Sequence, residues 1–247
     1  MYLLPLVLPL LNLVLSCLFG KLLGKRVVSL FIFNMFLCVI SCFFIFFEVG
    51  VSKFTCFIDL GSWLHIGLLR LNWVFFFDSI TVTMLLLVVF VSFLVHLYSV
   101  DYMSGDPHII RFLGYLSLFT FFMLMLVTAG NFVQLFLGWE GVGLSSYLLI
   151  NFWYTRVQAN KSAMKAIIVN RFGDFGIYFS LLIIFFCFKS FDFGVVFNLV
   201  ELVYFQDCFR LFIFELNKID FIVFFLFLGA IGKSAQLGLH TWLPDAM

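Results

Sequence analysis

Seven runs of about 18 or more apolar residues follow one another along the chain, and they decide what it can fold into. A run of this length crosses the hydrocarbon core of a bilayer as one helix. The composition excludes a soluble domain, since 64% of the residues are hydrophobic and 11% are charged. We therefore predict an all-α, polytopic integral membrane protein. The predicted spans are about 2–20, 27–47, 79–100, 111–129, 132–152, 162–187 and 219–240.

Two polar stretches interrupt the predicted helices. Residues 48–77 are too broken by polar side chains to cross a bilayer, so we expect a loop there. Residues 190–217 mix acids and bases with aromatic side chains, which favours an interfacial amphipathic segment or a loop. These boundaries divide the chain into a three-helix membrane segment, 1–110, and a second part, 111–247, with helices four to seven.

Basic residues in the short loops set the expected orientation. They concentrate on one side of the predicted bundle, which places that side inside, in the cytoplasm or the matrix. The N-terminus is then outside. The residues on the inner side are Lys21, Lys25, Arg26, Arg111, Arg156 and Lys161.

Several other classes of site are absent from the sequence. The net charge is +1 and no basic patch is dense, so we expect no nucleic-acid partner. The six cysteines include no CxxC pair and are interpreted as small apolar side chains. No phosphate-binding glycine loop, metal-ligand cluster or nucleophile triad is evident, and we expect no cofactor or metal. The 39 phenylalanines favour an AT-rich genome, such as that of an organelle.

A lysine interrupts the last apolar run. At the centre of a membrane helix, Lys233 would cost about 2.5–3.5 kcal/mol to insert, so it needs a partner or a water-filled cavity. Spacings of three, four and seven predict that Lys233, Gln236 and His240 share one helical face, along which waters would pass a proton. Gly232 and Pro244 favour a bent or broken helix. The structural alternative is a kinked packing helix whose lysine pairs with an acid.

An acid lies in a second apolar run. Glu140 stands in GWEGVG, where glycines allow another helix to approach closely or allow the backbone to bend. A carboxylate in the membrane is by default a functional candidate, here for taking up and releasing a proton. The alternative is a structural, hydrogen-bonded glutamic acid between helices.

The motif NRFGD adds charge to the sixth run. Arg171 and Asp174 are spaced three apart, so they can pair on one helix, as a functional or a merely structural couple. Asn170, Asp174 and Tyr178 form one polar stripe. Lys165 lies closer to the inner end and is interpreted either as a member of the same path or as a side chain that extends to the interface.

Two further polar residues belong to the third run, and we favour structural roles for both. Asp78 begins the run, where a helix cap is expected. His96 lies near its inner end.

Four segments together carry a resemblance to a known family. They are FDSITVTMLLLVVFVSFLVHLYSVDYM, RFLGYLSLFTFFMLMLVTAGNFVQLFLGWEGVGLSSYLLINFW, ANKSAMKAIIVNRFGDFG and GAIGKSAQLGLHTWLPDAM. They resemble the antiporter-like chain 5 proteins of mitochondrial respiratory complex I over about residues 73–180 and 229–247. The resemblance implies that Glu140 on the fifth helix pairs with Lys233 on a broken seventh. It also implies that Arg171 and Asp174 are network partners and that His240 is the histidine of a GLH motif.

The resemblance implies a function as well. It predicts the first part of an antiporter-like inverted-repeat fold, in a subunit of a proton-translocating NADH:ubiquinone reductase of the mitochondrial inner membrane. Redox chemistry would take place elsewhere, and the partners would be membrane lipids and other membrane subunits of the complex. Because the family continues beyond LPDAM, we expect a split or truncated subunit whose C-terminal half is a second polypeptide. The alternatives are a subunit of a secondary cation/proton antiporter and a structural membrane scaffold.

Overall fold

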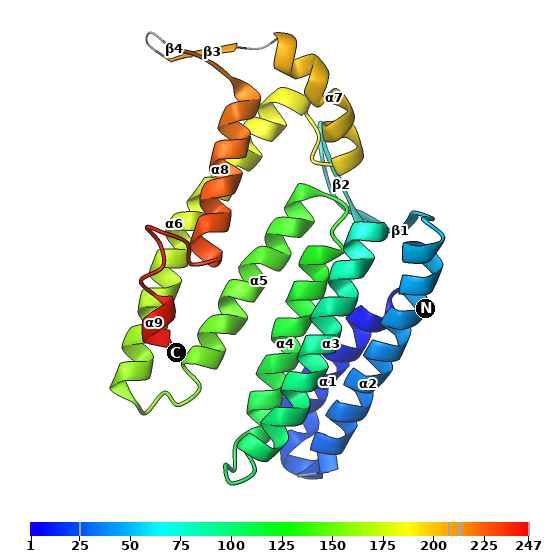
Figure 1. Cartoon of the computed structure of the whole chain (residues 1–247), viewed down its shortest axis with the longest axis vertical. Helices are drawn as coiled ribbons and strands as arrows, with labels where there is room; N and C mark the ends of the chain where they lie inside the picture. The colour runs from blue at the N-terminus through cyan, green and yellow to red at the C-terminus, as the bar shows by residue number, and fades with distance from the viewer. Residues whose placement is uncertain (25, 207, 212–213, 247) are drawn as a thin grey trace. The chain divides into compact units, whose positions relative to one another are not determined.

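The computed structural model describes residues 1–24, 26–206, 208–211 and 214–246, and most of them are helical (Figure 1). Five of its helices are long and apolar enough to cross a membrane: α2 together with the π-helix η1, and α3, α4, α5 and α6. The chain is thus a multi-pass membrane protein, as predicted. The count of seven spans is not confirmed, because the described apolar part of α1 (Leu4–Gly20) and the 16-residue α8 are shorter. The helices are α1 (Leu4–Leu23), α2 (Arg26–Ile45), η1 (Phe46–Val51), α3 (Ser79–Tyr102), α4 (Ile109–Val127), α5 (Phe132–Ile150), α6 (Val157–Phe188), α7 (Phe193–Gln206), α8 (Lys218–Lys233) and α9 (Leu243–Ala246).

The predicted loop at 48–77 is wrong for most of its length. The chain there forms a hairpin of strands β1 (Cys56–Ile66) and β2 (Leu69–Phe77). Gly67, with φ of 58°, supplies the left-handed conformation that a tight turn needs. Aromatic pairs then stabilise the two strands, since the Trp63 and Trp73 ring centroids lie 4.9 Å apart. Polar residues break a membrane helix but are compatible with an exposed hairpin, which explains the error.

Residues 190–217 are also more regular than a loop. They form the 14-residue helix α7 and the antiparallel strands β3 (Cys208–Leu211) and β4 (Phe214–Asn217). The pairing runs from Cys208 opposite Asn217 to Leu211 opposite Phe214. A location at the membrane interface stays a prediction for this segment.

The chain folds as two compact units, which are described separately. Unit 1 comprises 1–58, 75–129 and 137–152, and unit 2 comprises 59–74, 130–136 and 153–247. The division at residue 110, made on sequence, stays a prediction.

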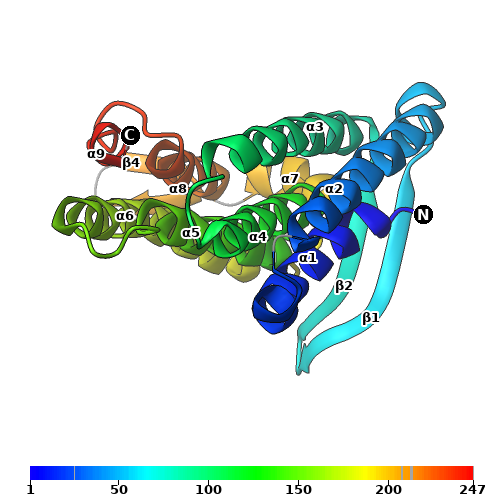
Figure 2. The same ribbon diagram turned by 90° about the horizontal axis from the view of Figure 1, so that it is seen from below.

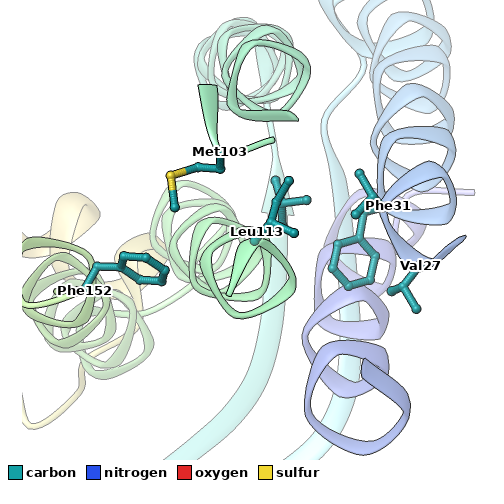
Figure 3. Close-up of a cluster of buried hydrophobic side chains, with 7 residues drawn as sticks. Val27, Phe31, Met103, Leu113 and Phe152 are labelled. Carbon is teal, nitrogen blue, oxygen red and sulfur yellow. The ribbon is translucent and has the colours of Figure 1, made fainter. Parts of the chain in front are cut away.

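Unit 1 is a helical bundle. Helix α1 packs against α2 and α4, and α3 packs against the same two helices (Figure 1 and Figure 2). Figure 3 shows part of its core, in which Val27 and Phe31 of α2 and Leu113 of α4 are fully buried. Met103, after α3, and Phe152, after α5, belong to the same cluster.

Asp78, the N-cap of α3, and His96 within α3 both have structural contacts, as expected. Asp78 caps the helix, because its carboxylate accepts a 2.7 Å hydrogen bond from the Thr81 N–H. The Thr81 hydroxyl accepts one from the Asp78 N–H in return. His96 is fully buried between α3 and α4, with Nδ1 2.7 Å from the Ser92 carbonyl oxygen and Nε2 3.2 Å from the Ser117 hydroxyl.

In unit 2, α8 runs antiparallel along α6 (Figure 1). At the end of α6 toward α7, buried apolar residues form a core: Phe132, Ile184, Phe188, Val196 and Ile222. This core and the glycines described next hold the two helices together.

Candidate functional site

Four glycines bring the backbones of α6 and α8 into contact in unit 2. A Cβ atom added to Gly173 would lie 3.1 Å from the Gly232 Cα, and one added to Gly176 would lie 2.7 Å from the Phe225 carbonyl oxygen. A Cβ on Gly229 would lie 2.4 Å from the Ile177 side chain. Small residues are the usual means by which membrane helices approach this closely. Contact at Gly173 and Gly232 fixes where their neighbours, Asp174 and Lys233, stand along the two helices.

The NRFGD motif presents buried and exposed groups from α6. Asp174 is 4% exposed and Asn170 is 6% exposed, whereas Arg171 and Tyr178 are exposed. The predicted stripe is therefore buried at Asn170 and Asp174 only. Tyr178 instead packs on Phe136, with ring centroids 4.6 Å apart.

Asn170 also has an unusual hydrogen-bond status. Its Oδ1 atom is buried and has no hydrogen-bond partner within the described part of the chain. A buried amide oxygen in this state costs about 1–3 kcal/mol unless it accepts a hydrogen bond, for which a water molecule serves. Since α6 and α8 are antiparallel, Asn170 lies one turn beyond the Gly173–Gly232 contact, toward the C-terminal end of α8.

Helix α8 ends at Lys233, and this corrects one prediction. Lys233, Gln236 and His240 do not share a helical face, because residues 234–242 form turns and irregular backbone rather than helix. Ala235 has a φ of 50°, and the Gln236 N–H donates to the Ile231 carbonyl, as in a Schellman helix end. Lys233 is half-buried, whereas Gln236 and His240 are exposed.

The segment after α8 folds back onto unit 2. The Trp242 indole N–H donates a 3.2 Å hydrogen bond to the Gly232 carbonyl, one of those left unpaired by the end of the helix. Asp245 in α9 forms a 2.5 Å ion pair with Lys165 of α6. The sequence predicts a place for Lys165 in the path or at the interface, and it does not predict this partner. The two residues lie 80 positions apart, and no local sequence signal links them.

Glu140 belongs to unit 1, where the glycines on either side of it allow another helix to approach, one of the two roles predicted for them. A Cβ on Gly138 would lie 2.7 Å from the Leu126 N atom, and one on Gly141 would lie 2.2 Å from the Phe122 ring. Helix α5 thus packs tightly on α4 at both glycines. Glu140, between them in sequence, is half-buried.

These residues provide ionisable groups suited to proton transfer. Asp174 precedes the end of α6, at Phe188, by 14 residues, or about 21 Å, which places it well inside a hydrocarbon core of about 30 Å. Lys233 stands where α8 ends and its backbone turns away, a feature that membrane transporters use at ion sites. Among the described residues, no group of three or more His, Cys, Asp or Glu side chains could hold a metal ion.

Comparison with known proteins identifies the family. The profile described as NADH-ubiquinone oxidoreductase (complex I), chain 5 N-terminus, matches residues 63–113, and that of the NADH:quinone oxidoreductase/Mrp antiporter membrane region matches 129–247. All of the chain aligns with NADH-ubiquinone oxidoreductase chain 5 of Acanthamoeba castellanii at 77% identity. The chain belongs to this chain 5 family. The corresponding proteins of Chondrus crispus and Arabidopsis thaliana are 56% and 49% identical to it, also over all of the chain.

The chain spans 37% of the length of these three relatives. A solved structure of the membrane-bound sulfane sulfur reductase, an archaeal respiratory membrane complex, has a chain with the same fold, at a TM-score of 0.77 and 18% identity. The match covers 98% of this chain and 46% of that one. The family assignment thus rests on sequence, and the solved structure supports the fold.

Proposed function

We propose that this chain forms part of a proton-translocating membrane-arm subunit of NADH:ubiquinone oxidoreductase in the mitochondrial inner membrane. The main support is the 77% identity to a chain 5 protein over every residue. The buried Asp174 and the half-buried Lys233, on helices in backbone contact, add a physical reason. Charged groups inside a membrane are costly and persist where they have a function. Other subunits of the complex would be its partners and would carry the redox cofactors.

Each candidate residue has a role in this proposal. Glu140 and Lys233 take up and release protons as their electrostatic surroundings change during the redox cycle. Arg171 and Asp174 bias the charge of Lys233, because a negative carboxylate favours the protonated lysine and a positive guanidinium group disfavours it. Lys165, Gln236 and His240 extend the path toward the aqueous side. Since Gln236 and His240 lie outside any helix, waters must connect them with Lys233.

Asn170 supplies a place for one such water. Its buried Oδ1 lacks a hydrogen-bond partner among the described groups, and it lies one turn of α6 from Asp174. A water molecule that donates to this oxygen would be held beside the carboxylate and could relay its proton. The sequence predicts only that Asn170 belongs to a polar stripe, and nothing in it predicts a buried oxygen without a partner.

The substitution Glu140→Gln tests the proposal. It keeps the shape of the side chain and removes the titrating group, so pumping should fall far more than assembly. The measurement is the number of protons translocated per electron pair by the purified, reconstituted complex. Glu201→Gln is the matched control, because Glu201 is an exposed glutamate of α7 and should leave pumping unchanged. Full pumping by the Glu140 variant would show that this glutamate is structural.

A cation/proton antiporter subunit is the second candidate, since the family profile over residues 129–247 names the Mrp antiporters together with the quinone oxidoreductases. Purification of the native complex distinguishes the two. A redox pump should retain flavin and iron–sulfur subunits, whereas an antiporter should contain neither.

A further inference from the structure

The side chain of Gln134, in the first turn of α5, is fully buried, and both ends of its amide are unpaired among the described residues. Its backbone N–H does have a partner, because it donates a 2.7 Å hydrogen bond to Oδ1 of Asn131, the residue before the helix. In a capping box, a glutamine at this position would accept a hydrogen bond from the N–H of the cap residue. The Gln134 oxygen does not, so the amide needs a donor and an acceptor from elsewhere.

Hydrogen bonds link Asn131 to the surface of unit 2. Its Nδ2 atom donates to the Asn72 carbonyl oxygen of β2 at 2.9 Å. The Nδ2 atom of Asn72 donates in turn to Oδ2 of Asp59 in β1, also at 2.9 Å. Asn131 is fully buried, whereas Asn72 and Asp59 are exposed. Polar groups therefore continue from an exposed carboxylate to the first turn of α5.

A second carboxylate lies beside this row of amides. The backbone before α5 pairs with the backbone before α7, so that Asn131 lies opposite Asp192. Burial raises the pKa of the Asp192 carboxyl, a hydrogen bond with Ser190 opposes the rise, and the negative charge of Asp59 adds to it. The two carboxylates are thus within electrostatic reach of each other. Like charges at one site favour the uptake of a proton by one of the two acids.

The position and chemistry of the Gln134 amide both favour water as its ligand. Helix α5 has 19 residues and is about 29 Å long, close to the thickness of a hydrocarbon core of about 30 Å. Gln134 is its third residue, so it lies within about 3 Å of one interface. A cation could bind the amide oxygen but could not accept a hydrogen bond from Nε2, whereas water molecules satisfy both ends.

We propose that Gln134 binds internal water at the inner end of a proton-exchange route that opens at Asp59 and Asp192. One water molecule donates to Oε1 and a second accepts from Nε2, and protons pass along such waters while the amide keeps its own. The route reaches α5, the helix that contains Glu140 six residues further on. The water site is independent of the proposed function, whereas its role in proton exchange rests on that function.

A cryo-EM map of the complete complex tests the water site. At a resolution that shows internal waters, at least one solvent peak should lie within about 2.7–3.2 Å of an end of the Gln134 amide. Protein groups bonded to both ends, from this chain or from another subunit, would overturn the proposal. So would a map with waters elsewhere in the membrane arm and no peak beside Gln134.

Substitutions in the same complex test the route, with protons translocated per electron pair as the readout. Gln134→Met keeps the length of the side chain and removes both hydrogen-bonding ends, so the ratio should fall toward that of Glu140→Gln. Gln134→Glu, whose carboxyl group still binds water, should retain most of the pumping. Gln158→Met is the matched control, because Gln158 is an exposed glutamine in the first turn of α6 and should leave the ratio unchanged.

The outcomes separate this inference from the proposed function. Full pumping by Gln134→Met together with a loss in Glu140→Gln would overturn the route and leave the proposed function intact. Full pumping by both variants would overturn the two together. An equal loss in Gln134→Met and Gln134→Glu would also overturn the route, since side-chain shape rather than water binding would then matter. If Gln134→Met prevents assembly, the map of the native complex decides.

Discussion

Replacing Gly176 by alanine should separate α6 from α8. The added Cβ would lie 2.7 Å from the Phe225 carbonyl oxygen, whereas carbon and oxygen atoms in proteins approach to about 3.3–3.6 Å. The helices must therefore move apart by roughly 0.6–0.9 Å. Because the obstacle is backbone, no side-chain rotation relieves it. We expect a loss of about 1–3 kcal/mol in the free energy of unfolding of unit 2, or roughly a five- to 150-fold change in its folding equilibrium.

Two matched substitutions control for the loss of glycine itself. Gly194→Ala, in the first turn of α7, adds a Cβ with nothing within 4 Å, so stability should be unchanged or rise by up to about 1 kcal/mol. Gly229→Ala meets the Ile177 side chain at 2.4 Å, an obstacle that a second substitution can remove. Ile177→Ala should cost about 2–5 kcal/mol alone, because Ile177 is buried, yet should cost much less in the Gly229→Ala background.

The assay is the thermal unfolding midpoint of the purified complex, with protons translocated per electron pair measured on the same samples. Gly176→Ala should lower the midpoint and also the pumping, since Asp174 and Lys233 depend on the same helix contact. Two results would contradict this expectation. One is a midpoint for Gly176→Ala equal to that for Gly194→Ala, and the other is additive effects of Gly229→Ala and Ile177→Ala on stability.

Three further substitutions should change stability in a predicted direction. Asp78→Ala removes the cap of α3 and should lower stability by about 1 kcal/mol, whereas Asp78→Asn should retain most of it, as thermal unfolding would show. Burial raises the pKa of the Asp192 carboxyl above its ordinary value of 3.8; a hydrogen bond with Ser190 opposes the rise, and the Asp59 carboxylate adds to it. The folded state then loses stability as the pH rises from 3.8 through the raised pKa. The unfolding midpoint of Asp192→Asn should therefore exceed that of the wild type by a margin that grows over this pH range and then levels off. Thermal unfolding measured at a series of pH values checks this. Ala235→Gly should raise the midpoint by the equivalent of about 1 kcal/mol, because alanine is strained at a φ of 50°; an unchanged midpoint would argue against that strain.

The sequence by itself determined the class of protein and most of its helices. Apolar runs are a one-dimensional signal, because a membrane helix satisfies its own backbone hydrogen bonds and needs only length and apolarity. The helix cap at Asp78 could also be predicted from the sequence, since its donor and acceptor are only three residues apart. For the glycines around Glu140 the sequence left two roles open, close approach of a helix or a bend of the backbone, and the structure shows close approach at Gly138 and Gly141.

Only the tertiary structure decided how the end of the chain is arranged. Helical spacing predicted Gln236 and His240 on the same face as Lys233. The helix instead ends at Lys233, because Ala235 adopts a left-handed conformation that is rare for alanine. The Lys165–Asp245 ion pair joins residues far apart in the sequence, and the hairpin at 56–77 depends on cross-strand pairs. Contacts between distant residues are set by packing rather than by any local pattern, so composition and periodicity do not predict them.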